Sequence, residues 1–304
     1  MNIRSIFSVA LLGLGFALGS QSALAFPLKA GQAVAPNTYP NLDDDRYVSE
    51  SSSFATAQAD FRGIVALDNC SASLVRTSFS RAEDFAMVLT NGHCFEGGFI
   101  DAGKIVSHKA SKRPMSLFTG ASASSPEVPL HATEVIYATM TSTDITLYQL
   151  KETYGEIQKK YGIEALLISD RRPEVGTEIE ILSGYWKRAY SCKIAAFVSK
   201  LKEDQWTFLD SIRYSQPGCA TIGGTSGSPI RDAITQAVIG INNTGNDDGA
   251  RCTLNNPCEV DENGKVTAVK GQSYGQETYW ITTCLNQKGK FDLSQNGCLL
   301  PKGK

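Results

Sequence analysis

Ser226 stands among small residues in the segment Gly223-Gly224-Thr225-Ser226-Gly227-Ser228-Pro229. A serine hydroxyl attacks a carbonyl at neutral pH only when a base takes its proton and donors hold the oxyanion that forms. The flanking glycines let the backbone turn sharply and bring N–H groups close to a bound carbonyl. Because a Gly/Ser-rich run is also typical of a surface turn, Ser226 is a candidate nucleophile only if the chain supplies a base and an acid to orient it.

His93 is the candidate base. It follows the apolar run that ends at Leu89-Thr90 and is directly followed by Cys94. An imidazole titrates near neutrality, so it can accept and return a proton. A disulfide at Cys94 would hold this histidine in place, whereas a single histidine without such context is more often structural or solvated.

Asp144 is the candidate orienting acid. It directly precedes Ile145-Thr146-Leu147-Tyr148-Gln149-Leu150, whose apolar alternation predicts a buried strand. A carboxylate at the entrance of a buried strand usually has a bonding partner, and an imidazole N–H is one such partner. Without Ser226 and His93, the aspartate would be interpreted as a turn residue that caps the strand.

The elements that must position these three residues are short. From Phe61 onward, apolar segments alternate with Gly, Ser, Asn and Asp clusters, a pattern typical of an all-β sandwich or barrel rather than of βαβ units. Residues 152–161 form either a short helix or a solvated connection, and residues 277–285 suggest a strand that runs into a terminal helix. We expect strands at Gly63–Leu67, Ala72–Val75, Phe85–Leu89, Val135–Tyr137, Ile145–Leu150, Ala165–Ile168, Ile179–Leu182, Lys193–Val198, Trp206–Ile212 and Ala237–Ile241.

Together the motifs resemble the chymotrypsin/trypsin-like serine endopeptidase superfamily, and its bacterial glutamyl-endopeptidase-like (V8-type) branch more than animal trypsins. The chain order His, Asp, Ser and the cysteine beside the histidine both match. This resemblance implies an all-β fold of two antiparallel six-stranded β-barrels, with the active site in the cleft between them and a short C-terminal helix. The segments that carry it are Cys70–Val75, Thr90–Cys94, Asp144–Leu150, Gly224–Pro229 and Val238–Gly245.

The resemblance also implies a reaction, the hydrolysis of peptide bonds through an acyl-enzyme. Ser226 is then the nucleophile, His93 the general base and later acid, and Asp144 the residue that orients His93. The N–H groups of Gly224 and Ser226 would form the oxyanion hole. A catalytically silent secreted binding protein on the same double-barrel scaffold is the alternative from another functional class.

Two other serine hydrolase folds fit the chain poorly. An α/β-hydrolase needs its histidine after the nucleophile, but no histidine follows Ser226, and position 228 is serine where Gly-x-Ser-x-Gly requires glycine. A subtilisin-like enzyme needs an aspartate before the histidine, for which Asp45 and Asp68 are available. That fold also needs βαβ alternation, which the β-rich pattern contradicts.

The specificity pocket departs from the family pattern. The resemblance places the base of the pocket six residues before the nucleophile, and the chain has Ala220 there. A trypsin-like preference for lysine or arginine is therefore not expected. Asn242 stands where glutamyl-specific relatives have histidine, and with Thr221 it predicts a polar, uncharged pocket. The resemblance also implies that Asn243, Thr244 and Gly245 bind the substrate backbone. Thr225 replaces the aspartate that pairs with the new N-terminus in animal trypsins, so activation by that ion pair is not expected.

The chain divides into an export signal, an arm and a protease domain. Arg4, the apolar run from Ile6 to about Leu18 and Ala23-Leu24-Ala25 predict a signal peptide over residues 1–25. Residues 26–58 are interpreted as a propeptide or N-terminal arm that would keep a zymogen inactive. Residues 59–304 form the protease domain, with barrels at about 59–155 and 156–285 and a disulfide-bonded tail. A secreted protein, extracellular or periplasmic, follows from this organisation.

The eight cysteines predict disulfides in an exported chain. The resemblance implies that Cys70 pairs with Cys94. A Cys192–Cys219 pair is plausible in front of the nucleophile loop, whereas Cys252–Cys258 and Cys284–Cys298 are suggested only by proximity.

No Cys-x-x-Cys or His-Glu-x-x-His motif is present, so we expect no metal and no cofactor. The formal net charge of −2 does not predict binding to nucleic acid or to a membrane surface. The expected partner is a polypeptide substrate, and the expected state is a monomer.

Overall fold

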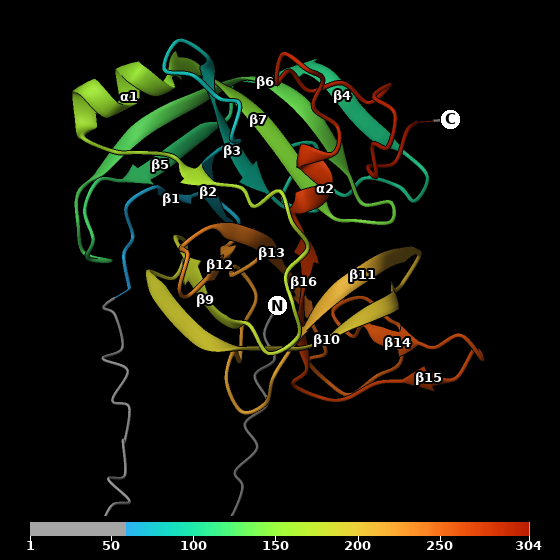
Figure 1. The fold of residues 1–304 in the computed structure, drawn as a ribbon. Helices are drawn as coiled ribbons and strands as arrows, with labels where there is room; N and C mark the ends of the chain where they lie inside the picture. Colours follow the sequence, from blue (N-terminus) through green and yellow to red (C-terminus); the bar gives the residue numbers. More distant parts are fainter. Residues whose placement is uncertain (1–58, 304) are drawn as a thin grey trace, which may run out of the picture. The chain divides into compact units, whose positions relative to one another are not determined.

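The computed structural model describes residues 59–303, shown in Figure 1. The predicted signal peptide at 1–25 and the arm at 26–58 lie outside the described residues. Within 59–303, no helix is both long enough and apolar enough to cross a membrane. In the described part of the chain, all strands but one pair antiparallel and only two segments are α-helical, so the all-β prediction is confirmed.

Six strands of the first sheet close into a barrel, in the order β1-β5-β6-β7-β3-β2 with β2 paired to β1. Two further strands lie outside this ring: β4 pairs with β6, and β8 runs parallel to β2. The strands are β1 (Ile64–Ala66), β2 (Ser71–Arg76), β3 (Phe85–Thr90), β4 (Ile105–Ala110), β5 (Pro114–Phe118), β6 (Glu127–Thr139), β7 (Ile145–Thr153) and β8 (Leu166–Leu167).

The second sheet closes in the same way, in the order β9-β10-β11-β16-β13-β12 with β12 paired to β9. Strands β14 and β15 extend it from β10. The two-barrel prediction is therefore confirmed. The strands are β9 (Glu178–Ser183), β10 (Arg188–Glu203), β11 (Trp206–Tyr214), β12 (Pro229–Asp232), β13 (Val238–Gly245), β14 (Cys258–Val260), β15 (Val266–Thr267) and β16 (Ser273–Glu277).

The long strand β6 shows how sequence periodicity builds the first core. Leu130 and Ala132 are buried at alternate positions, and the pattern resumes one residue out of phase at Val135 and Tyr137. The register to β7 shifts between Ala132 and Glu134, where a bulge inserts one residue and moves the inward face by one position. This change of phase is why only Val135–Tyr137 was recognisable as a strand from the sequence.

Each expected strand segment overlaps an observed strand, whereas β4, β5, β12, β14 and β15 were not expected. Strand β4 illustrates the reason, because its residues Ser107–Ala110 are all exposed and its sequence has no apolar alternation. Such strands form by pairing with a neighbour that the sequence pattern does not reveal.

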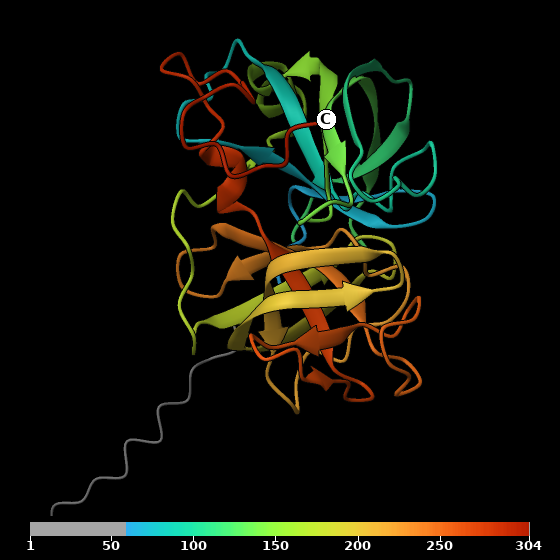
Figure 2. The same cartoon turned by 90° about the vertical axis from the view of Figure 1, so that its right-hand side faces the viewer.

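The two helices are short. The segment at 152–161 contains α1 (Tyr154–Tyr161), which begins with a capping box between Thr153 and Glu156 and ends at Gly162 in the left-handed region. Helix α2 (Tyr279–Thr282) follows β16, as the sequence suggested. Figures 1 and 2 both show the chain returning from the second barrel, so that α2 and the C-terminal tail lie against the first.

The β10–β11 hairpin connects the two barrels. Trp206 at the start of β11 donates its indole N–H to the carbonyl of Ile100 in the first barrel, at 2.8 Å. Further along the strand, the Leu209 N–H donates to the carbonyl of Ser142, also at 2.8 Å. Because Ser142 lies two residues before Asp144, the hairpin supports one wall of the site described next.

Candidate active site

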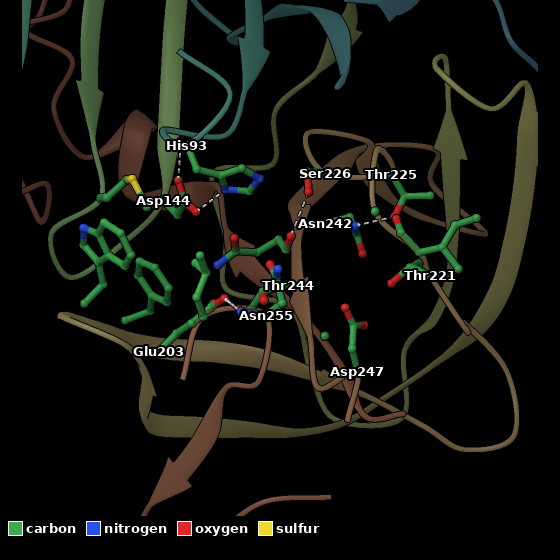
Figure 3. Close-up of a pocket in the computed structure, with 18 of the residues that line it drawn as sticks. His93, Asp144, Glu203, Thr221, Thr225, Ser226, Asn242, Thr244, Asp247 and Asn255 are labelled. Carbon is green, nitrogen blue, oxygen red and sulfur yellow. Dashed lines mark hydrogen bonds and ion pairs between the residues drawn. The ribbon is translucent and has the colours of Figure 1, made fainter. Parts of the chain in front are cut away.

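His93 and Asp144 are joined by two hydrogen bonds. The imidazole Nδ1 lies 2.7 Å from Asp144 Oδ2, and the His93 backbone N–H donates to Oδ1 at 2.9 Å (Figure 3). Asp144 is only 1% exposed, and the side-chain amide of Asn91 donates to its carbonyl. Because a carboxylate only accepts hydrogen bonds, Nδ1 carries the proton and Nε2 is left free to act as a base.

Gly92 makes the close approach of these two residues possible. A Cβ at this position would lie 2.0 Å from the carbonyl oxygen of Thr139 and 2.8 Å from Asp144 Oδ1. Real Cβ atoms do not come so near, so any side chain here would push the loop after β3 away from the start of β7. Glycine at position 92 therefore belongs to the geometry of the pair.

The pKa of His93 lies above its ordinary value of 6.5. Burial lowers it, but the charge and hydrogen bond of Asp144, together with the charge of Glu203, outweigh that effect. Each of these carboxylates stabilises the imidazolium form. The imidazole is thus suited to hold a proton taken from a neighbouring hydroxyl.

Ser226 lines the same pocket, on the turn before β12. Its hydroxyl donates to the carbonyl of Asn243 at 3.1 Å, and its own carbonyl accepts from the Ser71 N–H at 2.8 Å. The next residue, Gly227, has φ +82°, and a Cβ there would lie 2.0 Å from the Ser71 carbonyl oxygen. The serine turn is therefore hydrogen-bonded to β2 of the first barrel and packs closely against it, and only glycine fits directly after the serine.

The peptide group between Gly223 and Gly224 has a fixed orientation. Its carbonyl accepts the indole N–H of Trp186 at 2.6 Å. In a trans peptide the N–H points opposite to the carbonyl, so this bond turns the Gly224 N–H away from Trp186. Within residues 59–303, neither this N–H nor that of Ser226 has a hydrogen-bond acceptor. Both donors are thus available to a ligand oxygen.

The structure brings most of the predicted specificity residues into this pocket. Its lining includes Thr221, Asn242, Asn243, Thr244 and Gly245 together with the three candidate catalytic residues. The amide of Asn242 is already bonded, because its oxygen accepts from Tyr214 and its nitrogen donates to Thr225 Oγ1 at 3.2 Å. It shapes the pocket wall and has little capacity left for a ligand.

Ala220 does not line the pocket. Its side chain is exposed, just after the disulfide-bonded Cys219. Counting six residues back from Ser226 therefore does not find the pocket base in this chain.

Sequence reasoning missed several lining residues. They include aromatic and acidic side chains from remote segments: Phe99, Glu203, Trp206, Phe208 and Asp247. Trp186, which holds the Gly223 carbonyl, was also missed. The sequence feature that could have indicated these lining residues is the segment Glu203-Asp204-Gln205-Trp206. A charged hairpin end is, however, ordinarily interpreted as solvated.

Four disulfides hold the loops around the site. Cys70–Cys94 joins the start of β2 to the residue after His93, and Cys192–Cys219 joins β10 to the nucleophile loop. Cys252–Cys258 closes a small loop at the pocket rim, and Cys284–Cys298 ties the tail behind α2. These are the pairs that the sequence suggested.

Comparisons with known proteins agree with this architecture. The trypsin-like peptidase domain matches residues 74–241, more than half of the chain, and the chain belongs to this family of peptidases. No curated protein matches the chain.

Several solved structures are similar to the chain at low identity. The MamO protease domain from Magnetospirillum magneticum is 12% identical with a TM-score of 0.45, covering 75% of this chain and 98% of that one. The protease Rv3671c from M. tuberculosis in its active form is 13% identical with a TM-score of 0.42, covering 82% and 85%. A Glu endopeptidase is 17% identical with a TM-score of 0.41, covering 71% and 85%.

Proposed function

We propose that the protein is a serine endopeptidase that cleaves peptide bonds through an acyl-enzyme, with Ser226 as nucleophile, His93 as base and acid, and Asp144 as the residue that orients His93. One observation carries the proposal. The doubly hydrogen-bonded His93–Asp144 pair and Ser226 line one pocket (Figure 3), and within residues 59–303 the N–H groups of Gly224 and Ser226 on the serine turn have no acceptor.

The steps follow from these groups. His93 Nε2 takes the Ser226 proton as Oγ attacks the scissile carbonyl carbon, and Asp144 stabilises the imidazolium that forms. The carbonyl oxygen becomes an oxyanion held by the Gly224 and Ser226 N–H groups. The intermediate then collapses, His93 gives its proton to the leaving amine, and the acyl group stays on Ser226. Water, deprotonated by His93, releases the acyl group and restores the serine.

The substrate backbone binds beside β13. Pairing between β12 and β13 ends at Pro229 and Ile241, while β16 continues along the other edge as far as Gly245. The edge of residues 243–245 nearest Ser226 is therefore open, and an extended peptide can add there as a strand. This supports the proposed roles of Asn243, Thr244 and Gly245.

Within the family, we propose the V8-type branch on the basis of the sequence motifs, while Asn242 in place of histidine argues against glutamyl specificity. We also propose an exported enzyme kept inactive by residues 26–58. Four disulfides support an oxidising compartment. The side chain of Thr225, buried and bonded to Asn242, offers no carboxylate for a trypsin-type activation ion pair.

Labelling with an active-site serine phosphonate tests the proposal. The mature protein should be labelled at Ser226 and should hydrolyse a denatured protein, and Ser226→Ala should do neither. A folded protein that is neither labelled nor active would instead support the silent binding protein.

A further inference from the structure

Glu203 ends β10 and lines the pocket that also contains the candidate catalytic histidine. It pairs across the hairpin with Trp206, whose ring meets Phe99 edge-on at 5.5 Å. Phe99 in turn lies edge-on to His93, with ring centroids 6.2 Å apart. Since Trp206 is also bonded to Ile100, the hairpin tip is anchored at the first barrel. This anchoring fixes Glu203 in the wall of the pocket on the His93 side.

The Glu203 carboxyl group is buried without a cationic partner. It is 6% exposed, and one oxygen accepts the Asn255 N–H at 2.8 Å. None of the ion pairs among residues 59–303 includes it. Burial raises its pKa, although the Asn255 N–H, the Thr244 side chain and the charge of His93 each oppose the shift. A buried carboxylate of this kind is stabilised when a ligand supplies a positive charge.

The pocket as a whole favours such a ligand. Among the described residues, the acids that line it are Asp144, Glu203 and Asp247, and neither lysine nor arginine lines it. Asp144 is occupied by His93, so two carboxylates remain to face the substrate. A cleft lined by one sign of charge concentrates ligands of the opposite sign.

The alternation of an extended chain indicates which substrate residue meets Glu203. Successive side chains of a strand point to opposite faces. Figure 3 shows Thr221 and Thr225 on one side of Ser226, and Glu203 with His93 on the other. When the side chain of the scissile residue enters the Thr221 side, the side chain of the residue before it points toward Glu203.

We propose that Glu203 selects substrates with lysine or arginine immediately before the scissile residue, at P2; this rests on the endopeptidase function proposed above. The cation of that side chain pairs with the Glu203 carboxylate while the Asn255 bond persists. An acidic residue at P2 is rejected, because it would bring like charges together in a buried place.

The alternative is that Glu203 only anchors the loop of the Cys252–Cys258 disulfide through Asn255. Glu203→Gln separates the two roles, since glutamine keeps the size and an oxygen that accepts the Asn255 N–H but loses the charge. Asp247→Asn is the matched control, because it removes one negative charge from the same pocket at another wall.

The experiment compares fluorogenic peptides that differ only at P2, as lysine, glutamine or glutamate, by kcat/KM. The wild type should prefer lysine over glutamine by about tenfold or more, the range of a charge-assisted hydrogen bond. Added salt should weaken that preference. Glu203→Gln should bring the ratio close to unity, and Asp247→Asn should change it by less than about twofold, as expected for a charge that does not contact the P2 residue.

Three results would overturn the proposal: a wild type that shows no preference for lysine at P2, a Glu203→Gln enzyme that keeps the preference, or an Asp247→Asn enzyme that loses it. The wild-type profile and its salt dependence decide the matter even if Glu203→Gln fails to fold. Failure of the endopeptidase function itself looks different, because then no peptide is cleaved and Ser226 is not labelled.

Discussion

Ser226 donates its hydroxyl proton to the carbonyl of Asn243, 3.1 Å away. This carbonyl belongs to the open edge of β13, where we propose that the substrate backbone binds. A substrate N–H that takes the carbonyl therefore displaces the hydroxyl and frees it to turn toward His93. Substrate binding and activation of the nucleophile are coupled through one acceptor.

This coupling predicts that a backbone N–H on the ligand accelerates attack. A peptidyl phosphonate with a free N–H at the residue bound next to Ser226 should label the enzyme about tenfold faster than its N-methylated analogue, because one hydrogen bond is lost. Labelling rates followed by mass spectrometry measure the difference. Equal rates for the two reagents would mean that the Asn243 carbonyl plays no part.

Asp144→Asn should leave the fold intact and lower kcat by about four orders of magnitude. The asparagine oxygen can still accept the His93 backbone N–H, whereas its amide nitrogen would donate to Nδ1 and force the proton to Nε2. The histidine could then no longer act as a base. Steady-state kinetics with circular dichroism as a folding control would check this, and a variant with near wild-type kcat would contradict the role of Asp144.

Trp186→Phe should lower kcat by about tenfold with little change in KM, a loss typical of one weakened oxyanion contact. Phenylalanine keeps the aromatic ring but cannot donate to the Gly223 carbonyl, so the Gly224 N–H is no longer held toward the oxyanion. Tyr185→Phe is the control, since Tyr185 packs edge-on against Trp186 at 5.1 Å without that bond. A loss that falls on KM alone would point to substrate contact instead.

The acid limb of the pH–rate profile should reflect His93. Only the neutral imidazole can accept the serine proton, so kcat/KM rises as pH increases through the pKa of His93. That pKa is raised, and the charge of Glu203 contributes to the shift. Glu203→Gln should therefore move the acid limb to lower pH, while Asp247→Asn should not. A limb that stays in place in Glu203→Gln would mean that Glu203 does not act on the imidazole.

Glu277 predicts a pH dependence of stability. Burial raises the pKa of this side chain to about 7, although Arg172 lies 3.1 Å away and opposes the shift. Because the folded pKa exceeds the unfolded one, the contribution is full below pH 4.5 and is lost as pH rises toward 7. Glu277→Gln should remove this loss, which amounts to at most about 3 kcal/mol.

Urea unfolding of wild type and variant at pH 5 and pH 8 would test this, with Glu259→Gln as a control that breaks another ion pair of the same sheet, to Arg213. If the free energy of unfolding of Glu277→Gln falls between the two pH values as much as that of the wild type, Glu277 is not the group responsible.

The sequence alone was sufficient for the features that are encoded locally. Apolar alternation and frequent turns predicted an all-β chain, and three short motifs singled out Ser226, His93 and Asp144. A motif carries such information because the residues beside each side chain, such as Gly92 and Gly227, are the ones that its geometry requires. The disulfide partners were likewise suggested by proximity in the chain or implied by the family resemblance.

The tertiary structure alone decided what surrounds Ser226. Glu203 lines the pocket of His93 because a hairpin of the second barrel is hydrogen-bonded to the first at Ile100, and Trp186 on the β9–β10 turn reaches Gly223 on the loop before β12. Ala220, placed at the pocket base by counting along the chain, is exposed and lies outside the pocket lining. These contacts join residues far apart in sequence, and no local pattern records which strands will pair. For this protein, the candidate catalytic residues could be predicted from the sequence, whereas the negative charge of the pocket became evident only from the tertiary structure.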